Sequence, residues 1–315
     1  MSQNDEEKKE EVKEEKKEEI EEKKFDLTDE NDFLMSSSIN EMEMIREEIG
    51  KSQPLVSDPK PLEHLLKEFN DHSNYRRQIE TLITNKQHSA YRQLRADGNC
   101  FYRAFLLGLF ETVEATKNEQ ILETVTKNVV TSNDRLVKFG YEQFALSEFY
   151  ESFMDELALY QSILSSDDSS GVNIAESTAV QKLSDESHVE LFVLCRSLNE
   201  AKVFFNLKKQ SNYLIFWARM LTSLQMQENE KHFSQFVQGK TFREFLQTDV
   251  EAVHAEADHP QFCALSMAIE VPVRVFCLEN VETGGPQVVT IPENGQPLFD
   301  LLYRPGHYDI LYRKS

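Results

Sequence analysis

The spacing of apolar residues along this chain changes once, near residue 271, and this change limits the folds available to it. Before that point, apolar residues recur every three or four positions in many segments, which is the spacing of one face of a helix. After it, 271–276 alternates apolar and polar residues, and short strand-like runs follow at 288–291, 301–303 and 308–312. The sequence therefore predicts an α+β fold in which a helical part packs on a small, mostly antiparallel sheet, with its strands joined as a meander.

Helical spacing marks several segments before the strands. Ser57-Asp58-Pro59 is typical of a helix start, because proline is well placed in a first turn, and four apolar residues between 62 and 69 would form one face of that helix. The other segments with helical spacing are 75–83, 101–109, 119–138, 147–164, 211–224, 242–253 and a short helix that begins at Asp258-His259-Pro260.

The N-terminal region and one internal stretch differ in composition from the rest. Residues 1–38 form an acidic tail whose first part is almost entirely Glu and Lys, so we expect it to be disordered. Residues 39–56 carry apolar residues at helical spacing and form a predicted helical extension that either packs on the domain or contacts a partner. The Ser- and Asp-rich stretch at 165–187 is predicted to be a long loop within a single domain at 57–315; the alternative is a domain boundary.

Charge and cysteine content exclude several classes of function. The formal net charge of -21 argues against nucleic acid as a partner and suits a basic protein or peptide, unless the charge serves only to keep the protein in solution. The four cysteines form no CxxC pair, so no metal site, cofactor or disulfide framework is indicated. The charged N-terminus and the lack of a long apolar run indicate neither a signal peptide nor a membrane span. We therefore expect the protein in the cytoplasm or the nucleus.

Cys100 lies where a predicted turn becomes a predicted helix, in the stretch DGNCFYRAF. Gly98 allows a tight backbone bend, and the helix that follows would begin at Cys100. Unpaired N–H groups and the positive end of the helix dipole favour a thiolate at such a position. The local sequence also permits the alternative that Cys100 is a small buried hydrophobic residue.

A candidate base for this thiol lies near the C-terminus. His307 and Asp309 are two positions apart, so in an extended strand their side chains leave the same face. A carboxylate beside an imidazole holds the tautomer that accepts a proton from a thiol, and it stabilises the imidazolium that forms. The alternative is a histidine whose hydrogen bonds are satisfied at a strand edge.

The two segments together resemble the catalytic segments of the ovarian-tumour (OTU) deubiquitinating cysteine proteases, specifically the otubains. The resemblance is carried by DGNCFYRAF and LLYRPGHYDILY, which occur in the order nucleophile then base. The intervening PLVSDPKPLEHLLKEF, SNYLIFWARMLTS and EADHPQFCALSMA are also similar to otubains in order and spacing, so the resemblance spans about residues 39–314. The chain is more similar to the longer, N-terminally extended otubain, but its loop near 165–187 is longer than the family pattern and its Glu/Lys tail has no counterpart.

The resemblance implies an OTU-type, papain-like cysteine protease fold and an active site. Cys100 would be the nucleophile, His307 the general base and then acid, and Asp309 the residue that orients His307. Asp97 matches the active-site aspartate of the family. We expect Asp97 to shape the loop whose backbone N–H groups, with that of Cys100, form an oxyanion hole.

The resemblance also implies a function. The protein would be a deubiquitinase that hydrolyses isopeptide bonds in polyubiquitin and prefers chains linked through lysine forty-eight of ubiquitin. Its partners would be ubiquitin, polyubiquitin and ubiquitin-conjugating enzymes, with the extension at 39–56 contacting proximal ubiquitin or the conjugating enzyme. The alternative is a non-catalytic inhibitor of conjugating enzymes. The residues expected to contact the distal ubiquitin are Tyr213, Phe216, Trp217, Asp258, His259 and Ile291.

Overall fold

The computed structural model of the chain describes residues 53–69, 73–165 and 208–314. The predictions for the tail at 1–38, for residues 39–52 of the extension and for the loop at 166–187 lie outside these residues. Within the described ranges, no helix combines the length and the apolar character that a bilayer crossing requires.

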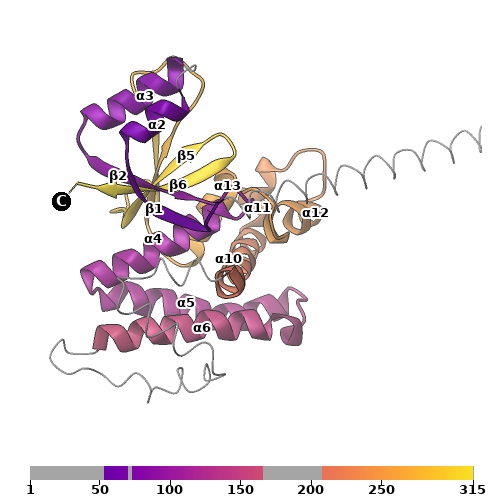
Figure 1. Cartoon of the computed structure of the whole chain (residues 1–315). Helices are drawn as coiled ribbons and strands as arrows, with labels where there is room; N and C mark the ends of the chain where they lie inside the picture. The colour runs from indigo at the N-terminus through magenta and orange to yellow at the C-terminus, as the bar shows by residue number, and fades with distance from the viewer. Residues whose placement is uncertain (1–52, 70–72, 166–207, 315) are drawn as a thin grey trace, which may run out of the picture. The chain divides into compact units, whose positions relative to one another are not determined.

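A mixed sheet of six strands organises the described part of the chain (Figure 1), in the order β1-β2-β6-β5-β3-β4. Its strands are β1 (Val56–Pro61), β2 (His88–Leu94), β3 (Val273–Cys277), β4 (Gln287–Ile291), β5 (Phe299–Arg304) and β6 (His307–Arg313). Every neighbouring pair is antiparallel except β3 and β5, so the prediction of a mostly antiparallel sheet is confirmed. The predicted meander is wrong. β4 lies at the sheet edge beside β3, and the next strand in the chain, β5, pairs with the opposite side of β3.

The predicted helix start at Ser57-Asp58-Pro59 is wrong. These residues lie in β1, which pairs antiparallel with β2, a strand that the sequence analysis missed. Proline donates no backbone hydrogen bond, so β1 suits it as an edge strand. The helix begins later, as α2 (Glu63–Glu68). Leu55 and Val56 are buried in the core, so the folded unit begins before the predicted boundary at residue 57.

The other predicted helices are confirmed, with shifted ends in several cases. They are α3 (Ser73–Thr84), α4 (Cys100–Thr116), α5 (Glu119–Lys138), α6 (Gln143–Ser165), α10 (Lys208–Glu228), α12 (Phe242–Phe245) and α13 (His259–Ala268), and a short helix that was not predicted, α11 (Glu230–Phe233), follows α10. A 3-10 turn, η2 (Ser234–Phe236), follows α11, and a π-helical turn, η3 (Leu246–Glu251), follows α12. The segment predicted as one helix at 242–253 is therefore α12 continued by η3.

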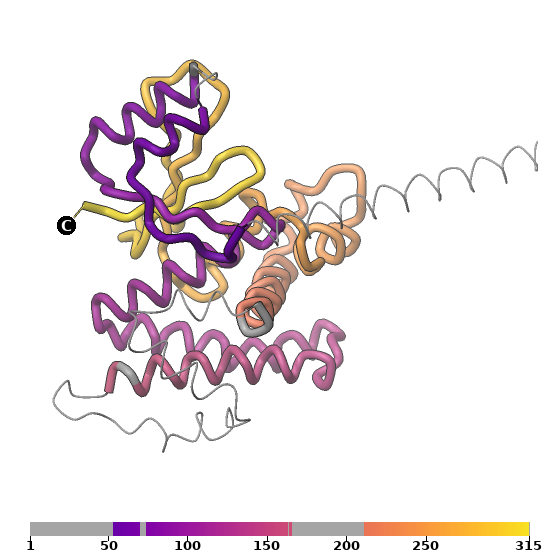
Figure 2. Tube along the Cα trace, in the orientation of Figure 1, coloured from indigo at the N-terminus to yellow at the C-terminus, as the bar shows by residue number. Residues whose placement is uncertain are grey.

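Different helices cover the two faces of the sheet (Figure 1). The apolar cluster beneath α2 and α3 includes Leu62, Leu65, Ile79, Leu82, Leu302 and Leu311. On the other face, α4 lies against β5 and β6, and Leu301 and Ile310 join a larger cluster with α4, α10 and α13. Successive strand residues point to opposite faces, so β5 and β6 contribute neighbouring residues to separate clusters. Figure 2 shows the N-terminal strands β1 and β2 beside the C-terminal strands β5 and β6.

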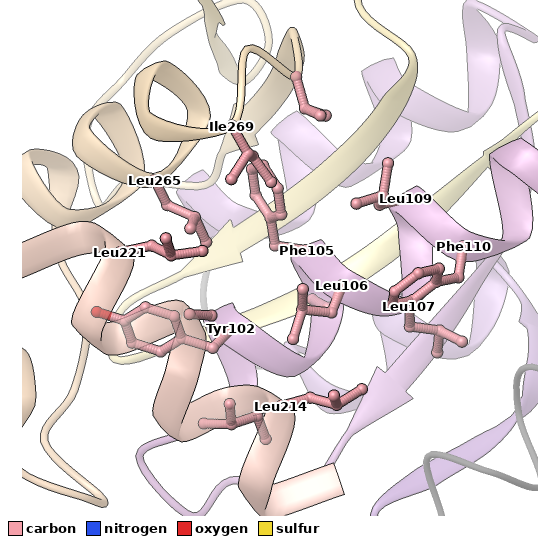
Figure 3. Close-up of a cluster of buried hydrophobic side chains, with 14 of the residues drawn as sticks. Tyr102, Phe105, Leu106, Leu107, Leu109, Phe110, Leu214, Leu221, Leu265 and Ile269 are labelled. Carbon is pink, nitrogen blue, oxygen red and sulfur yellow. The ribbon is translucent and has the colours of Figure 1, made fainter. Parts of the chain in front are cut away.

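Helix α4 runs through the middle of the larger cluster. Every residue from Cys100 to Phe110 is buried, and a helix that is buried all round is a core helix. Figure 3 shows its side chains packed among residues of α10 and the end of α13. Gly108 allows close approach to the sheet, because a Cβ atom there would lie 2.7 Å from Cδ2 of Phe299. The start of α4, where Cys100 lies, is therefore held by packing along the first three turns.

Candidate active site

Cys100 is the first residue of α4, as predicted, and it is a free, buried cysteine. The preceding residue, Asn99, is the helix N-cap, but its side chain accepts no hydrogen bond from the first turn. The positive end of the helix dipole therefore lies at the Cys100 thiol, without a side-chain cap between them.

His307 and Asp309 lie on β6 and share one face of the strand, as predicted. The distance between His307 Nε2 and Asp309 Oδ1 is 2.8 Å, and Asp309 is fully buried. The other ring nitrogen, Nδ1, is buried and makes no well-formed hydrogen bond to any described residue. Because Asp309 occupies Nε2, Nδ1 is the nitrogen left to exchange a proton with a thiol.

Cys100 lies close enough to His307 to change its ionisation. Burial lowers the pKa of His307, but hydrogen bonding and charge from Asp309 and Cys100 outweigh burial and raise this pKa to about 9. The buried Nδ1 makes no well-formed hydrogen bond to a described residue in this structure. Hydrogen bonds between catalytic groups commonly tighten only when substrate binds. The His307 ring can therefore be held as an imidazolium beside Cys100.

The Asp309 carboxylate is held by groups that the sequence analysis did not identify. The backbone N–H of Leu94 donates to Oδ1 at 3.0 Å, and Nη2 of Arg304 lies 2.7 Å from Oδ2. Arg304 also pairs with Glu68, which accepts a hydrogen bond from Tyr91. These partners come from β2, β5 and α2, so no local sequence pattern links them to Asp309. Together they fix the carboxylate that orients His307.

Asp97 does not bond to His307; it closes the loop before Cys100. Its carboxylate accepts two hydrogen bonds from Arg103, at 3.0 and 2.8 Å, and one from the backbone N–H of Asn99 at 3.0 Å. Burial opposes ionisation of Asp97, but Arg103 and the Asn99 N–H outweigh it and hold its pKa below the usual range. Asp97 thus shapes the loop that leads to the nucleophile.

The same loop packs directly on the segment before α13. Gly98 has a left-handed φ of +78°, and a Cβ atom at this position would lie 1.9 Å from the carbonyl oxygen of His254. The ring nitrogen Nδ1 of His254 lies 2.9 Å from the carbonyl oxygen of Asp97 and 3.1 Å from Nδ2 of Asn99. Only glycine fits the backbone conformation and the space at position 98.

A pocket of about 380 Å³ reaches His307 from the side of α2 and α3. Its lining combines side chains from several elements: Gln53, Phe69, Tyr75, Gln93, Ala96, Arg304, Pro305 and His307. The His307 side chain therefore borders a pocket lined by polar and aromatic groups.

The residues predicted to contact ubiquitin divide into accessible and buried ones. Asp258 and His259 are exposed at the start of α13, where Asp258 is the N-cap, and Ile291 is half-buried at the end of β4. Tyr213 and Phe216 are half-buried on α10. Five of the six positions therefore keep some exposed surface.

Trp217 is the exception, and its prediction as a contact residue is wrong. Its side chain is 0% exposed and packs on the Tyr150 ring, with centroids 5.2 Å apart. Trp217 lies in the helical apolar stripe of α10 and faces the core, so no partner can touch it. An apolar stripe at helical spacing most often marks the core.

Comparison with known proteins agrees with this geometry. A family model, Peptidase C65 Otubain, matches residues 48–204 and 178–313. Ubiquitin thioesterase OTUB1 of Rattus norvegicus and that of Homo sapiens are each 32% identical over 276 residues, which is 87% of this chain and 88% of the relative. A solved complex of h/ceOTUB1, ubiquitin aldehyde and UBC13~Ub has a TM-score of 0.69 and 25% identity, covering 89% of this chain and 98% of that chain.

The contact between Gly98 and His254 predicts unequal effects of two glycine substitutions. Gly98→Ala should destabilise the protein by about 3 kcal/mol, because a left-handed conformation and a backbone clash both oppose the new methyl group. Gly140 is the matched control, since its φ is +91° and a Cβ atom there would meet nothing within 4 Å. Gly140→Ala should cost only about 1 kcal/mol. Urea unfolding measures both, and equal losses would contradict the close packing at Gly98.

The raised pKa of His307 predicts a titration in the alkaline range. NMR of the His307 ring should show a midpoint at about 9, and Asp309→Asn should lower it by about 1 to 2 units, because the neighbouring carboxylate favours the imidazolium. A pKa raised on folding means that the charged ring stabilises the fold fully below pH 6.5 and loses this effect as the pH rises through 9.

The control for this titration is Asp134→Asn, which removes an exposed carboxylate on α5. It should leave the His307 midpoint unchanged. A wild-type midpoint near 6.5, or equal midpoints in wild type and Asp309→Asn, would show that Asp309 does not control the ring.

Proposed function

Because the chain belongs to the otubain family of cysteine peptidases, we propose that it is a deubiquitinase that hydrolyses isopeptide bonds at the C-terminus of ubiquitin. The observation that carries this proposal is the site itself, in which Asp309 lies 2.8 Å from His307 and Cys100 raises the pKa of that ring. Relatives of this chain are named ubiquitin thioesterase or deubiquitinating enzyme.

The first half of the proposed reaction forms a thioester. The Cys100 thiolate attacks the carbonyl carbon of the isopeptide bond, and the resulting oxyanion accepts hydrogen bonds from the backbone N–H of Cys100 and of the preceding loop. The His307 imidazolium gives its Nδ1 proton to the lysine nitrogen as the C–N bond breaks. The lysine leaves as an amine, and the ubiquitin C-terminus stays bonded to the Cys100 sulfur.

The second half releases ubiquitin. A water molecule loses a proton to the now neutral His307 and attacks the thioester carbonyl, and the bond to sulfur breaks. Ubiquitin leaves with a free carboxylate, and the proton returns the pair to thiolate and imidazolium. Asp309 keeps Nδ1 directed at the reacting atoms in both halves, because it holds the opposite nitrogen.

The proposed substrates are polyubiquitin chains, with a preference for linkage through lysine forty-eight. The net charge of -21 suits a partner that is basic in part, as ubiquitin is at its C-terminal tail. The distal ubiquitin would meet the accessible positions Tyr213, Phe216, Asp258, His259 and Ile291, without Trp217. The linkage preference is supported by the family resemblance.

Cleavage of di-ubiquitins of every linkage tests this proposal. The wild-type chain should cut the lysine-forty-eight-linked form fastest, and Cys100→Ser should abolish cleavage, because a hydroxyl lacks the acidity of the thiol. The matched control is Cys263→Ser. Cys263 Sγ lies 3.4 Å from His259 Nε2, but burial raises the pKa of this thiol to about 11, so its loss should leave the rate unchanged. Cleavage by Cys100→Ser would overturn the role of Cys100 as nucleophile, and equal rates for all linkages would overturn the linkage preference.

A second function, inhibition of ubiquitin-conjugating enzymes without catalysis, is favoured by one comparison. Two of the solved structures similar to this chain are complexes that contain UBC13~Ub as well as ubiquitin aldehyde. In this chain, residues 39–56 are the proposed contact with a charged conjugating enzyme.

This second function predicts that Cys100→Ala still suppresses chain synthesis by a conjugating enzyme. Removal of residues 1–52, which spares the buried Leu55 and Val56, should abolish the suppression. Ubiquitin-chain assembly by a purified conjugating enzyme measures both effects. Suppression that is lost in Cys100→Ala and kept after the truncation would contradict the proposal.

A further inference from the structure

Arg219, on α10, is a fully buried cation close to the nucleophile. Its side chain is 0% exposed, and it forms an ion pair with no carboxylate among the described residues. Burial lowers the pKa of Arg219, and the nearby Asp97 carboxylate opposes this shift without cancelling it. A buried guanidinium without a bonded counter-ion is costly unless hydrogen bonds compensate it. Its hydrogen-bond partners therefore indicate what the residue does.

The guanidinium connects three backbone segments. Its acceptors are the carbonyl oxygens of Gly98 at 3.0 Å, Val250 at 2.9 Å and Ala255 at 2.7 Å, together with Oδ1 of Asn99 at 2.8 Å from Nη2 and 3.3 Å from Nε. The guanidinium also lies 4.3 Å from the centroid of the Tyr102 ring, and Figure 3 shows this ring between α4 and α10. Arg219 thus ties the loop before Cys100 to the π-helical turn η3 and to the segment before α13.

The peptide between Gly98 and Asn99 is held from both sides. Its carbonyl oxygen accepts a hydrogen bond from Arg219, and its N–H donates to Asp97 at 3.0 Å. The C=O and N–H of a trans peptide point in opposite directions, so these two bonds together fix the rotation of the peptide plane. The next N–H along the chain is that of Cys100, whose direction depends on this plane and on the backbone of Asn99.

We propose that Arg219 is a positioning residue of the hydrolytic site: it holds the loop at 97–99 so that the backbone N–H of Cys100 faces the oxyanion. The proposal rests on the proposed deubiquitinase function. Arg219 itself does not touch the reacting atoms. Lysine cannot take its place, because one ammonium group cannot reach the carbonyls of Gly98, Val250 and Ala255 as the planar guanidinium does.

Two variants of Arg219 and one matched control test this role in the full chain. Arg219→Gln removes the charge and most of the donors, and Arg219→Lys keeps the charge. The control is Arg92→Gln, since Arg92 is also nearly buried and lies 5.4 Å from the centroid of a tyrosine ring, Tyr312, but pairs with Glu111 away from the loop.

Three measurements separate positioning from general loss of structure. The first is kcat and KM for hydrolysis of a ubiquitin C-terminal fluorogenic amide. The second is the limiting rate at high pH of Cys100 alkylation by iodoacetamide, read at the Cys100 peptide by mass spectrometry. Alkylation is a displacement that forms no oxyanion, so its rate reports only the reactivity of the Cys100 thiolate. The third is the melting temperature of each variant.

Arg219→Gln should lower kcat about 100-fold with KM within about 3-fold, which is the scale of losing one oriented oxyanion donor. Its limiting alkylation rate should stay within about 3-fold of wild type, because alkylation forms no oxyanion and needs no oriented N–H donors. Arg219→Lys should lose about 10-fold in kcat, since it retains the charge and part of the bonding. Arg92→Gln should lower the melting temperature and leave kcat within about 3-fold.

An unchanged kcat in Arg219→Gln would overturn the proposal, as would equal losses of hydrolysis and alkylation. If Arg219→Gln does not fold, the ratio of hydrolysis to alkylation in Arg219→Lys decides: a ratio equal to that of wild type overturns the proposal, and a lower ratio supports it. Failure of the wild-type chain to hydrolyse the amide would instead overturn the proposed function, before any variant is compared.

Discussion

The packing of α4 against β6 is the interaction on which the active site depends. Cys100 and His307 are 307 - 100 = 207 positions apart, and only this helix-to-strand contact brings them together. Phe101 and Tyr308, the residues that follow them, meet with ring centroids 5.1 Å apart. The contact is mainly apolar, with Phe101, Tyr308 and Ile310 in one buried cluster, so hydrophobic burial places the reacting groups. Because well-packed interiors tolerate little displacement, the thiol and the imidazole keep their positions relative to each other.

Behind this apolar contact, three arginines hold the polar parts of the site. Arg103 pairs with Asp97, Arg304 pairs with Asp309, and Arg219 binds backbone carbonyls of the nucleophile loop. A hydrophobic core does not need such groups, and burying them opposes folding unless their hydrogen bonds are satisfied. Here each one holds a group that positions either the nucleophile loop or His307. The nucleophile loop and the Asp309 carboxylate are therefore held in place by bonds within the chain itself, and such preorganisation lowers the cost of reaching a transition state.

A second cysteine and histidine show why proximity alone does not make a nucleophile. Cys263 Sγ lies 3.4 Å from His259 Nε2, yet burial raises the pKa of the Cys263 thiol to about 11. Cys263 lies inside α13 and not at its first residue, so the helix N-terminus does not favour its thiolate. Cys100 has both the helix start and a histidine held by a carboxylate. The chemistry thus follows from where each thiol lies in its helix and from what surrounds its partner.

The sequence by itself determined the helix start at Cys100, the shared strand face of His307 and Asp309, and most helices, because these depend on residues a few positions apart. It did not predict β1 and β2, the parallel pairing of β3 with β5, or the burial of Trp217. Arg103 is close to Asp97 in sequence, but only the folded loop shows that the two residues form an ion pair. Arg219, Arg304 and His254 act across long separations, and only the tertiary structure brought them to the site. Local patterns report the periodicity of one element, whereas the partners of a buried polar group are decided by which elements pack together.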